Sequence, residues 1–270
     1  MARYTSVSGL CLCSRLSTDN GEMKSPQEKP CYRASLNRRV VAEAVGTVML
    51  LMAIVGSGIM GERLAAGNNA IALLANSLAT GAALFALILT FGPISGAHFN
   101  PAVTFSDASQ GGLPWREVPA YVVAQISGAF LGVALANTMF GLPVFFASKH
   151  IRSGASLLLS EGVAIFGLLA VIWGCVRFQS SSVPFAVAAY ITGAYWFTSS
   201  TAFANPAVTL ARAATDTFAG IRPSDVPGFI LSQVAGAAAA TGLFRWLAPA
   251  LPQYADAVVV EHKREKHDGQ

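Results

Sequence analysis

Long apolar segments without charge alternate with short polar ones along most of this chain. The longest stretch without Asp, Glu, Lys or Arg runs from Leu64 to Ser106. A helix of roughly 18 or more such residues crosses about 30 Å of hydrocarbon, and the segments lack the strict alternation of membrane β-strands. The pattern therefore predicts an all-α membrane protein with six crossing helices, at about residues 40–61, 70–92, 118–140, 157–177, 182–199 and 226–247.

The two halves of the chain repeat each other. The letters NPAVT begin at Asn100 and again at Asn205, and AEAVGT around Glu43 is echoed by SEGVAI around Glu161. Gln125 and Gln233 likewise occupy matched places in the third and sixth spans. Because each half has three spans, an odd number, the second half crosses the membrane in the opposite sense. Such inverted repeats place the functional site near the membrane midplane.

Each Asn-Pro-Ala motif predicts the start of a helix. Asn is a preferred N-cap, and Pro is favoured at the first helical position. The apolar run after each motif is about ten residues, too short to cross. We therefore expect two re-entrant half-helices whose N-termini meet at the centre, where each carries about half a positive charge. The pore motifs are Asn100-Pro101-Ala102 and Asn205-Pro206-Ala207, and the two Asn amides are expected to donate hydrogen bonds to a passing neutral solute.

Composition and charge agree with a membrane channel. The 270 residues are 53% hydrophobic and 12% charged, about half the charged fraction of a soluble domain. Thirteen of the 18 Lys and Arg residues precede the first span, follow the last, or lie in loops on that side. The positive-inside rule then places both termini in the cytoplasm. This topology accounts for the net charge of +4 without a nucleic-acid partner, and no motif of an enzyme is present.

Two polar tails flank the predicted channel domain. Residues 1–37 are expected to form a disordered cytoplasmic N-terminal tail and residues 251–270 a cytoplasmic C-terminal tail. The channel domain spans 38–250, with repeats at about 38–142 and 155–250. Cys11, Cys13 and Cys31 offer three sulfurs to a soft metal, but their spacing is not that of a zinc module, and we expect no metal site and no cofactor. Cys175, alone in a span, is expected to serve packing.

The motifs SGAHFNPAVTF, AFANPAVTL, AEAVGT and AQISGA resemble those of the aquaporin, or major intrinsic protein, family over about residues 38–248. The resemblance implies six tilted helices plus two half-helices, and a homotetramer with one pore per subunit. It also implies a multi-pass protein of the cytoplasmic (inner) membrane. The expected activity is passive flow of water or small neutral solutes across the lipid bilayer.

The expected selectivity filter departs from that of the water-selective relatives. Those relatives carry Arg directly after the second motif, where this chain has Val208. Spacing from the two Asn residues gives Thr80, Gly193 and Ala202 as the other filter positions. All four are small and uncharged, which predicts a wide pore that passes glycerol-like polyols and water. Val in place of Arg also resembles bacterial members associated with arsenic resistance, which adds metalloid acids such as arsenite or methylarsenicals to the candidate solutes.

Several roles stay open at this point. Arg212 lies four residues after Val208 and either reaches the pore or pairs with Asp216, the arrangement that we expect. Glu43 and Glu161 either accept hydrogen bonds from the loops that lead into the half-helices or mark a proton relay; their matched positions favour support. His98 lines the pore, ties down its loop, or does both. The alternative functions are a water-selective aquaporin and, less favoured, a proton-coupled transporter.

Overall fold

A computed structural model of the chain describes residues 34–178 and 180–247. These residues form eight α-helices joined by loops and three short 3-10 turns, with no β-strand in the part described. The helices are α1 (Leu36–Leu64), α2 (Asn69–Ser95), α3 (Pro101–Gln110), α4 (Val118–Met139), α5 (Ala155–Phe178), α6 (Val183–Phe197), α7 (Pro206–Arg212) and α8 (Val226–Leu247).

Five of the six predicted spans are long and apolar enough to cross a membrane, and they correspond to α1, α2, α4, α5 and α8. The sixth, predicted at 182–199, is α6, which has 15 residues and therefore spans about 22 Å. Helix α6 ends at Phe197 because the backbone adopts an extended conformation at Thr198, with φ −108° and ψ 134°. The chain is nevertheless an all-helical multi-pass membrane protein, as predicted.

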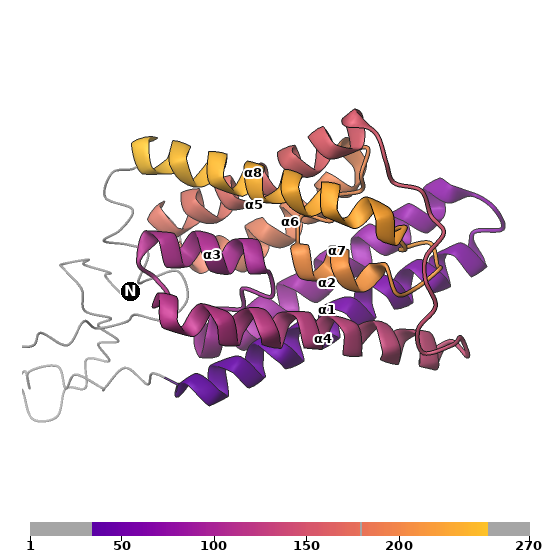
Figure 1. The fold of residues 1–270 in the computed structure, drawn as a ribbon, viewed down its shortest axis with the longest axis horizontal. Helices are drawn as coiled ribbons and strands as arrows, with labels where there is room; N and C mark the ends of the chain where they lie inside the picture. The colour runs from indigo at the N-terminus through magenta and orange to yellow at the C-terminus, as the bar shows by residue number, and fades with distance from the viewer. Residues whose placement is uncertain (1–33, 179, 248–270) are drawn as a thin grey trace, which may run out of the picture. The chain divides into compact units, whose positions relative to one another are not determined.

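The two short helices α3 and α7 are the expected half-helices. Each begins at the Pro of a motif, directly after an Asn N-cap whose backbone is extended. They have 10 and 7 residues, too few to cross a bilayer. In Figure 1, α3 lies toward the end of the bundle where α1 begins and α8 ends, and α7 lies toward the opposite end. We call these the α3 end and the α7 end.

Glycines bring matched helix pairs of the two repeats into close contact. A Cβ atom on Gly128 of α4 would lie 2.6 Å from the carbonyl oxygen of Ala44 in α1. A Cβ on Gly236 of α8 would collide in the same way with the carbonyl oxygen of Gly162 in α5. These two glycines therefore serve helix contacts within the subunit, because only glycine lets two backbones approach this closely.

We expect Gly236→Ala to lower the stability of the protein by about 1–3 kcal/mol, the usual effect of overpacking a tight contact. The new methyl group would push α8 away from α5. Gly242→Ala on the same helix is the matched control, since nothing lies within 4 Å of its added Cβ. Thermal unfolding of the purified protein in detergent measures both variants. Equal melting temperatures for the two would contradict the close-contact role of Gly236.

Most of the two predicted tails, with Cys11, Cys13 and Cys31, lies outside the described residues. The overlap is small, because α1 already begins at Leu36, inside the predicted tail 1–37. Cys175 is half-buried with a free thiol, and it packs against an apolar cluster around α5 and α6. This position agrees with the packing role expected from the sequence.

Candidate functional site

The two motif asparagines meet at the centre of the protein and bind each other's loops. The side-chain amide of Asn100 donates to the carbonyl oxygen of Ala204 at 2.8 Å. The amide of Asn205 donates to the carbonyl oxygen of Phe99 at 2.7 Å. Each NH2 group has two hydrogens, so one N–H on each Asn is left for a solute. Hydrogen bonds thus link the N-terminus of each half-helix to the loop that precedes the other one.

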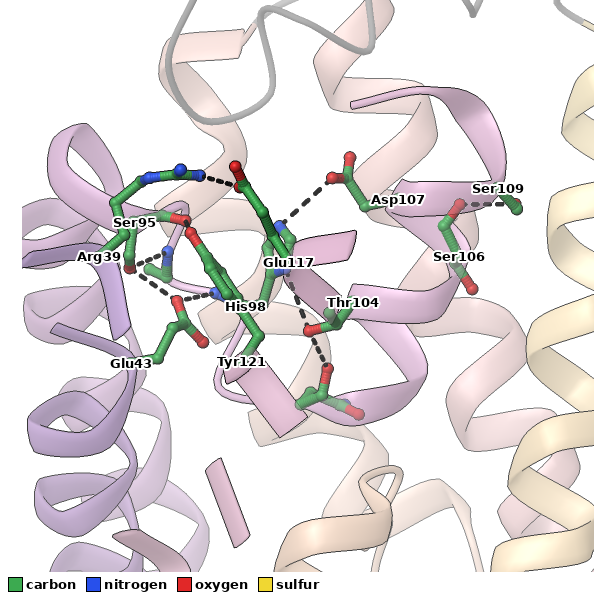
Figure 2. A network of polar contacts seen from close by, with 12 residues as sticks. Arg39, Glu43, Ser95, His98, Thr104, Ser106, Asp107, Ser109, Glu117 and Tyr121 are labelled. Carbon is green, nitrogen blue, oxygen red and sulfur yellow. Dashed lines mark hydrogen bonds and ion pairs between the residues drawn. The ribbon is translucent and has the colours of Figure 1, made fainter. Parts of the chain in front are cut away.

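A buried glutamate holds the loop before the first half-helix (Figure 2). The Glu43 carboxylate accepts the backbone N–H of His98 at 3.0 Å and that of Phe99 at 2.7 Å. It also accepts the hydroxyl of Ser95 at 2.6 Å. Gln125 completes the set by donating to Glu43 at 2.8 Å. These contacts are those expected of a loop support.

The second repeat builds the same support with its own residues. Glu161 accepts the backbone N–H groups of Phe203 and Ala204, both at 2.9 Å. Gln233 donates to Glu161 at 2.7 Å and to the Thr209 hydroxyl at 2.9 Å. Both glutamates are therefore fully engaged in loop structure, which favours support over a proton relay.

The supported loops have an unusual backbone. Ala97 and Phe99 before the first motif have φ values of 47° and 49°, and Ala202 and Ala204 before the second have 48° and 46°. Positive φ is uncommon in residues other than glycine, and strained backbone conformations cost roughly 1–3 kcal/mol each. The glutamate contacts offset this strain and fix which backbone groups border the space between the half-helices.

That space is a cavity of about 470 Å³ that passes both asparagines. Ser180 and Ser181 line it at the α3 end, and Arg212 lines it at the α7 end. Its walls are mostly apolar side chains from α1, α2, α5 and α6. Of the residues predicted from the sequence, the cavity is lined by Thr80, His98, Asn100, Ala202, Asn205 and Val208.

The structure corrects the predicted place of Gly193. This residue is exposed on the outward face of α6 and does not line the cavity. Ile191 and Tyr195 of the same helix line it instead. The Tyr195 hydroxyl lies 3.2 Å from the hydroxyl of Thr80 across the α7 end. Spacing along the chain gave the right helix but the wrong face of it.

The structure also corrects the expected Arg212–Asp216 pair. Helix α7 ends at Arg212, so Asp216 does not follow one turn later on the same helical face. A carboxylate oxygen of Asp216 accepts the backbone N–H of Lys149 at 2.8 Å. Arg212 is 2% exposed, donates from Nε to the carbonyl oxygen of Ala219, and lines the cavity. The α7 end is thus not free of charge, contrary to the expectation of an uncharged filter.

Comparison with known proteins places this architecture in a family. Residues 31–177 match the family model described as major intrinsic protein. The chain is 55% identical over 218 residues to the aquaglyceroporin AqpS of Rhizobium meliloti (strain 1021), covering 80% of this chain and 93% of that protein. The chain belongs to the major intrinsic protein family.

Other relatives of this family member are more distant. The chain is 31% identical over 164 residues to the aquaporin NIP1-3 of Oryza sativa subsp. japonica, covering 60% of this chain and 56% of that protein. The X-ray structure of the aquaglyceroporin from Plasmodium falciparum aligns with a TM-score of 0.63 at 17% identity, covering 81% of this chain and all of that one. The last match supports the fold alone.

Within this major intrinsic protein, the two ends of the cavity differ in chemistry. His98 lies two residues before Asn100, lines the cavity, and has its Nδ1 3.1 Å from the Thr104 hydroxyl. Its Nε2 lies 3.7 Å from the Asp107 carboxylate, as Figure 2 shows. His98 therefore both borders the pore and is tied to its own half-helix. The described residues hold no cluster of three His, Cys, Asp or Glu side chains that could bind a metal ion.

The matched positions of the second repeat hold Phe203 and Arg212. The guanidinium carbon of Arg212 lies 3.4 Å from the centroid of the Phe203 ring, and that of Arg152 lies 5.0 Å from it. Burial lowers the pKa of the Arg152 guanidinium below its ordinary value, while the nearby Glu161 carboxylate acts in the opposite direction. Sequence reasoning missed Tyr195, Phe203 and Arg152, although comparing the two repeats at equal spacing from each Asn would have singled out Phe203.

Proposed function

We propose that this chain is a passive transmembrane channel for small neutral solutes, glycerol-like polyols and water. The observation that carries the proposal is the pair of motif asparagines bordering one cavity between two half-helices. The relative that is 55% identical is named an aquaglyceroporin, which supports the same solute class.

The lining suits molecules that are polar on one side and apolar on the other. The free N–H of Asn100 and of Asn205 can donate to a solute hydroxyl at the centre, while the apolar wall contacts the carbon backbone of a polyol. An ion gains little from such a wall and loses its hydration, which costs several kcal/mol or more. The cavity therefore favours neutral solutes over charged ones.

Small side chains at the α7 end set the size limit in this proposal. Thr80, Ala202 and Val208 border the cavity there and leave room beside them that an Arg at position 208 would fill. Undissociated metalloid acids such as arsenite and methylarsenicals are small, neutral and rich in hydroxyl groups. We include them among the solutes on the strength of Val208 and the resemblance of this filter to those of arsenic-associated members.

We place the channel in the cytoplasmic (inner) membrane with the α3 end facing the cytoplasm. The excess of Lys and Arg near both chain ends supports this orientation. We further propose a homotetramer with one pore in each subunit. Large apolar side chains on the outer surface, among them Leu159, Phe185 and Leu231, are 68–70% exposed in the single chain, and lipid or neighbouring subunits would cover them.

Light scattering of proteoliposomes in a glycerol gradient tests the proposal. We expect shrinkage followed by fast re-swelling as glycerol enters, whereas an impermeant sugar in place of glycerol gives shrinkage alone. Empty liposomes provide the background rate of re-swelling. Fast shrinkage without re-swelling above that background would reject the glycerol pathway.

That outcome would favour a water-selective aquaporin, the second candidate function. Arg212 and Tyr195, which both line the α7 end, are the observation in its favour, because a guanidinium and a ring narrow the opening. The ratio of glycerol to water permeability in one proteoliposome preparation separates the two candidates. A flux that runs uphill on a proton gradient would reject both and return the glutamates to consideration as a relay.

A further inference from the structure

We propose that the α7 end of the cavity is a binding site for small planar carboxylates, centred on Arg212, and that an occupant blocks neutral solute flow. The blocking effect rests on the proposed function, whereas the binding site itself does not. The Arg212 side chain is buried, yet it lines the cavity. Its Nε is held by the carbonyl oxygen of Ala219. Within the described residues, the terminal nitrogens of Arg212 have no hydrogen-bond partner in the protein, and they are not sealed from solvent.

A guanidinium held at Nε presents its terminal N–H groups as a fixed fork. This geometry matches two oxygens on one atom, as in a carboxylate, and such bidentate pairs are stronger than hydrogen bonds between neutral groups. The guanidinium carbon of Arg212 lies 3.4 Å from the centroid of the Phe203 ring, and this stacking restricts rotation of the guanidinium plane. The site is therefore ordered before any ligand arrives, which lowers the entropy cost of binding.

The positive charge at this end exceeds the negative charge near it. Neither Arg212 nor Arg152 forms an ion pair with a carboxylate among residues 34–178 and 180–247. The Arg152 side chain instead donates to three backbone carbonyls, the closest being Gly220 at 2.8 Å. Two guanidiniums face the nearby carboxylate of Glu161, so a net positive charge remains that attracts an anion.

The matched position at the opposite end of the cavity holds an acidic residue instead of a basic one. Asp107 follows Asn100 by seven residues, as Arg212 follows Asn205. Asp107 lies 3.7 Å from His98, so the acidic group there has a basic neighbour of its own. The Tyr195 hydroxyl and Thr80 add neutral hydrogen-bonding groups to the α7 end. The charge asymmetry between the two ends is what favours an anion at Arg212.

The test compares sodium formate with sodium chloride at equal concentration on both sides of the proteoliposome membrane. A competitor at about ten times its dissociation constant leaves roughly one-tenth of the sites free. We therefore expect saturating formate to slow glycerol re-swelling about tenfold relative to chloride. In a second measurement, thermal unfolding of the purified full-length protein, formate should raise the melting temperature above its value in chloride.

Three variants assign the effect. Arg212→Gln should remove both responses to formate, and Arg212→Lys, which keeps the charge but not the fork, should weaken them. Lys149→Gln is the matched control, because Lys149 is an exposed cation on the α7 side and the bond it makes to Asp216 comes from its backbone. It should behave as the unsubstituted protein does. If Arg212→Gln does not fold, Arg212→Lys and the unsubstituted protein still give the comparison.

Equal behaviour in formate and chloride would overturn the site, whatever the glycerol rate. So would a formate response that survives in Arg212→Gln, or one that Lys149→Gln removes equally well, since the latter would indicate general surface charge. If glycerol does not flow in either salt but formate still raises the melting temperature through Arg212, the proposed solute is wrong and the binding site stands.

Discussion

Replacing Val208 with Arg is expected to lower glycerol permeability at least about tenfold, because a guanidinium beside Thr80 and Ala202 adds bulk and a strong donor to the lining. Val208 is 3% exposed and lines the cavity one helical turn before Arg212. Water is smaller than glycerol and should still pass. The expected phenotype is therefore a change of solute preference, with water flow kept and glycerol flow lost.

The measurement is the pair of rates from one proteoliposome preparation, osmotic shrinkage for water and re-swelling for glycerol. Val208→Thr is the matched control, since it keeps the size of the side chain and should keep glycerol flow. Like charges four residues apart in a helix also destabilise it by a few tenths of a kcal/mol, so the melting temperature of Val208→Arg should be recorded alongside. Unchanged glycerol flow in a folded Val208→Arg protein would show that the size limit lies elsewhere.

Replacing Glu161 with Gln should lower the stability of the protein by about 3 kcal/mol, because hydrogen bonds to a charged acceptor contribute roughly 1.5–3 kcal/mol each and a buried donor left unsatisfied adds a further cost. The two carboxylate oxygens accept three donors, from Phe203, Ala204 and Gln233. An amide replaces one oxygen with a group that itself donates, so at least one donor would then face another. The loop that holds Ala202 and Ala204 at positive φ would lose its support.

Thermal unfolding again gives the readout, with Glu43→Gln as the matched variant of the other repeat. Glu62→Gln, an exposed substitution at the end of α1, is the control that should leave the melting temperature unchanged. The same loss in both buried variants is expected, because the two glutamates make corresponding contacts with their loops. A melting temperature unaffected by Glu161→Gln would mean that the loop keeps its shape without the carboxylate.

The repeat made much of this fold predictable. Asn-Pro-Ala has a direct meaning in helix chemistry, and two copies at matched places define where half-helices begin. The glutamates were also predictable as supports, because an isolated charge in an apolar span needs partners. The Asn-Pro-Ala motifs are local sequence features, and both the motifs and the glutamates occur at matched positions in the two repeats.

The incorrect predictions, for Gly193 and for the Arg212–Asp216 pair, depended on helix rotation and helix length, which residue spacing along the chain does not determine. Counting back from Asn205 identified Gly193, but the rotation of α6 about its axis depends on how the helix packs and where it ends, and this placed Tyr195 at the cavity. Arg212 and Asp216 are four residues apart, yet they would share a helical face only if α7 continued past Arg212. Helix ends are set by tertiary contacts as well as by sequence. The positions of the Arg212 and Asp216 side chains could therefore be established only from the structure.

The reciprocal bonds of the two asparagines have a consequence for biosynthesis. The partner of the Asn100 amide is the carbonyl of Ala204, 104 positions later in the chain. At a synthesis rate of about 5–20 residues per second, that partner is made roughly 5–20 s after Asn100 itself. The first half-helix must therefore wait in the membrane with its key amide unsatisfied or bound to water. Closure of the pore centre therefore cannot precede synthesis of the second repeat, which supplies the partner of Asn100.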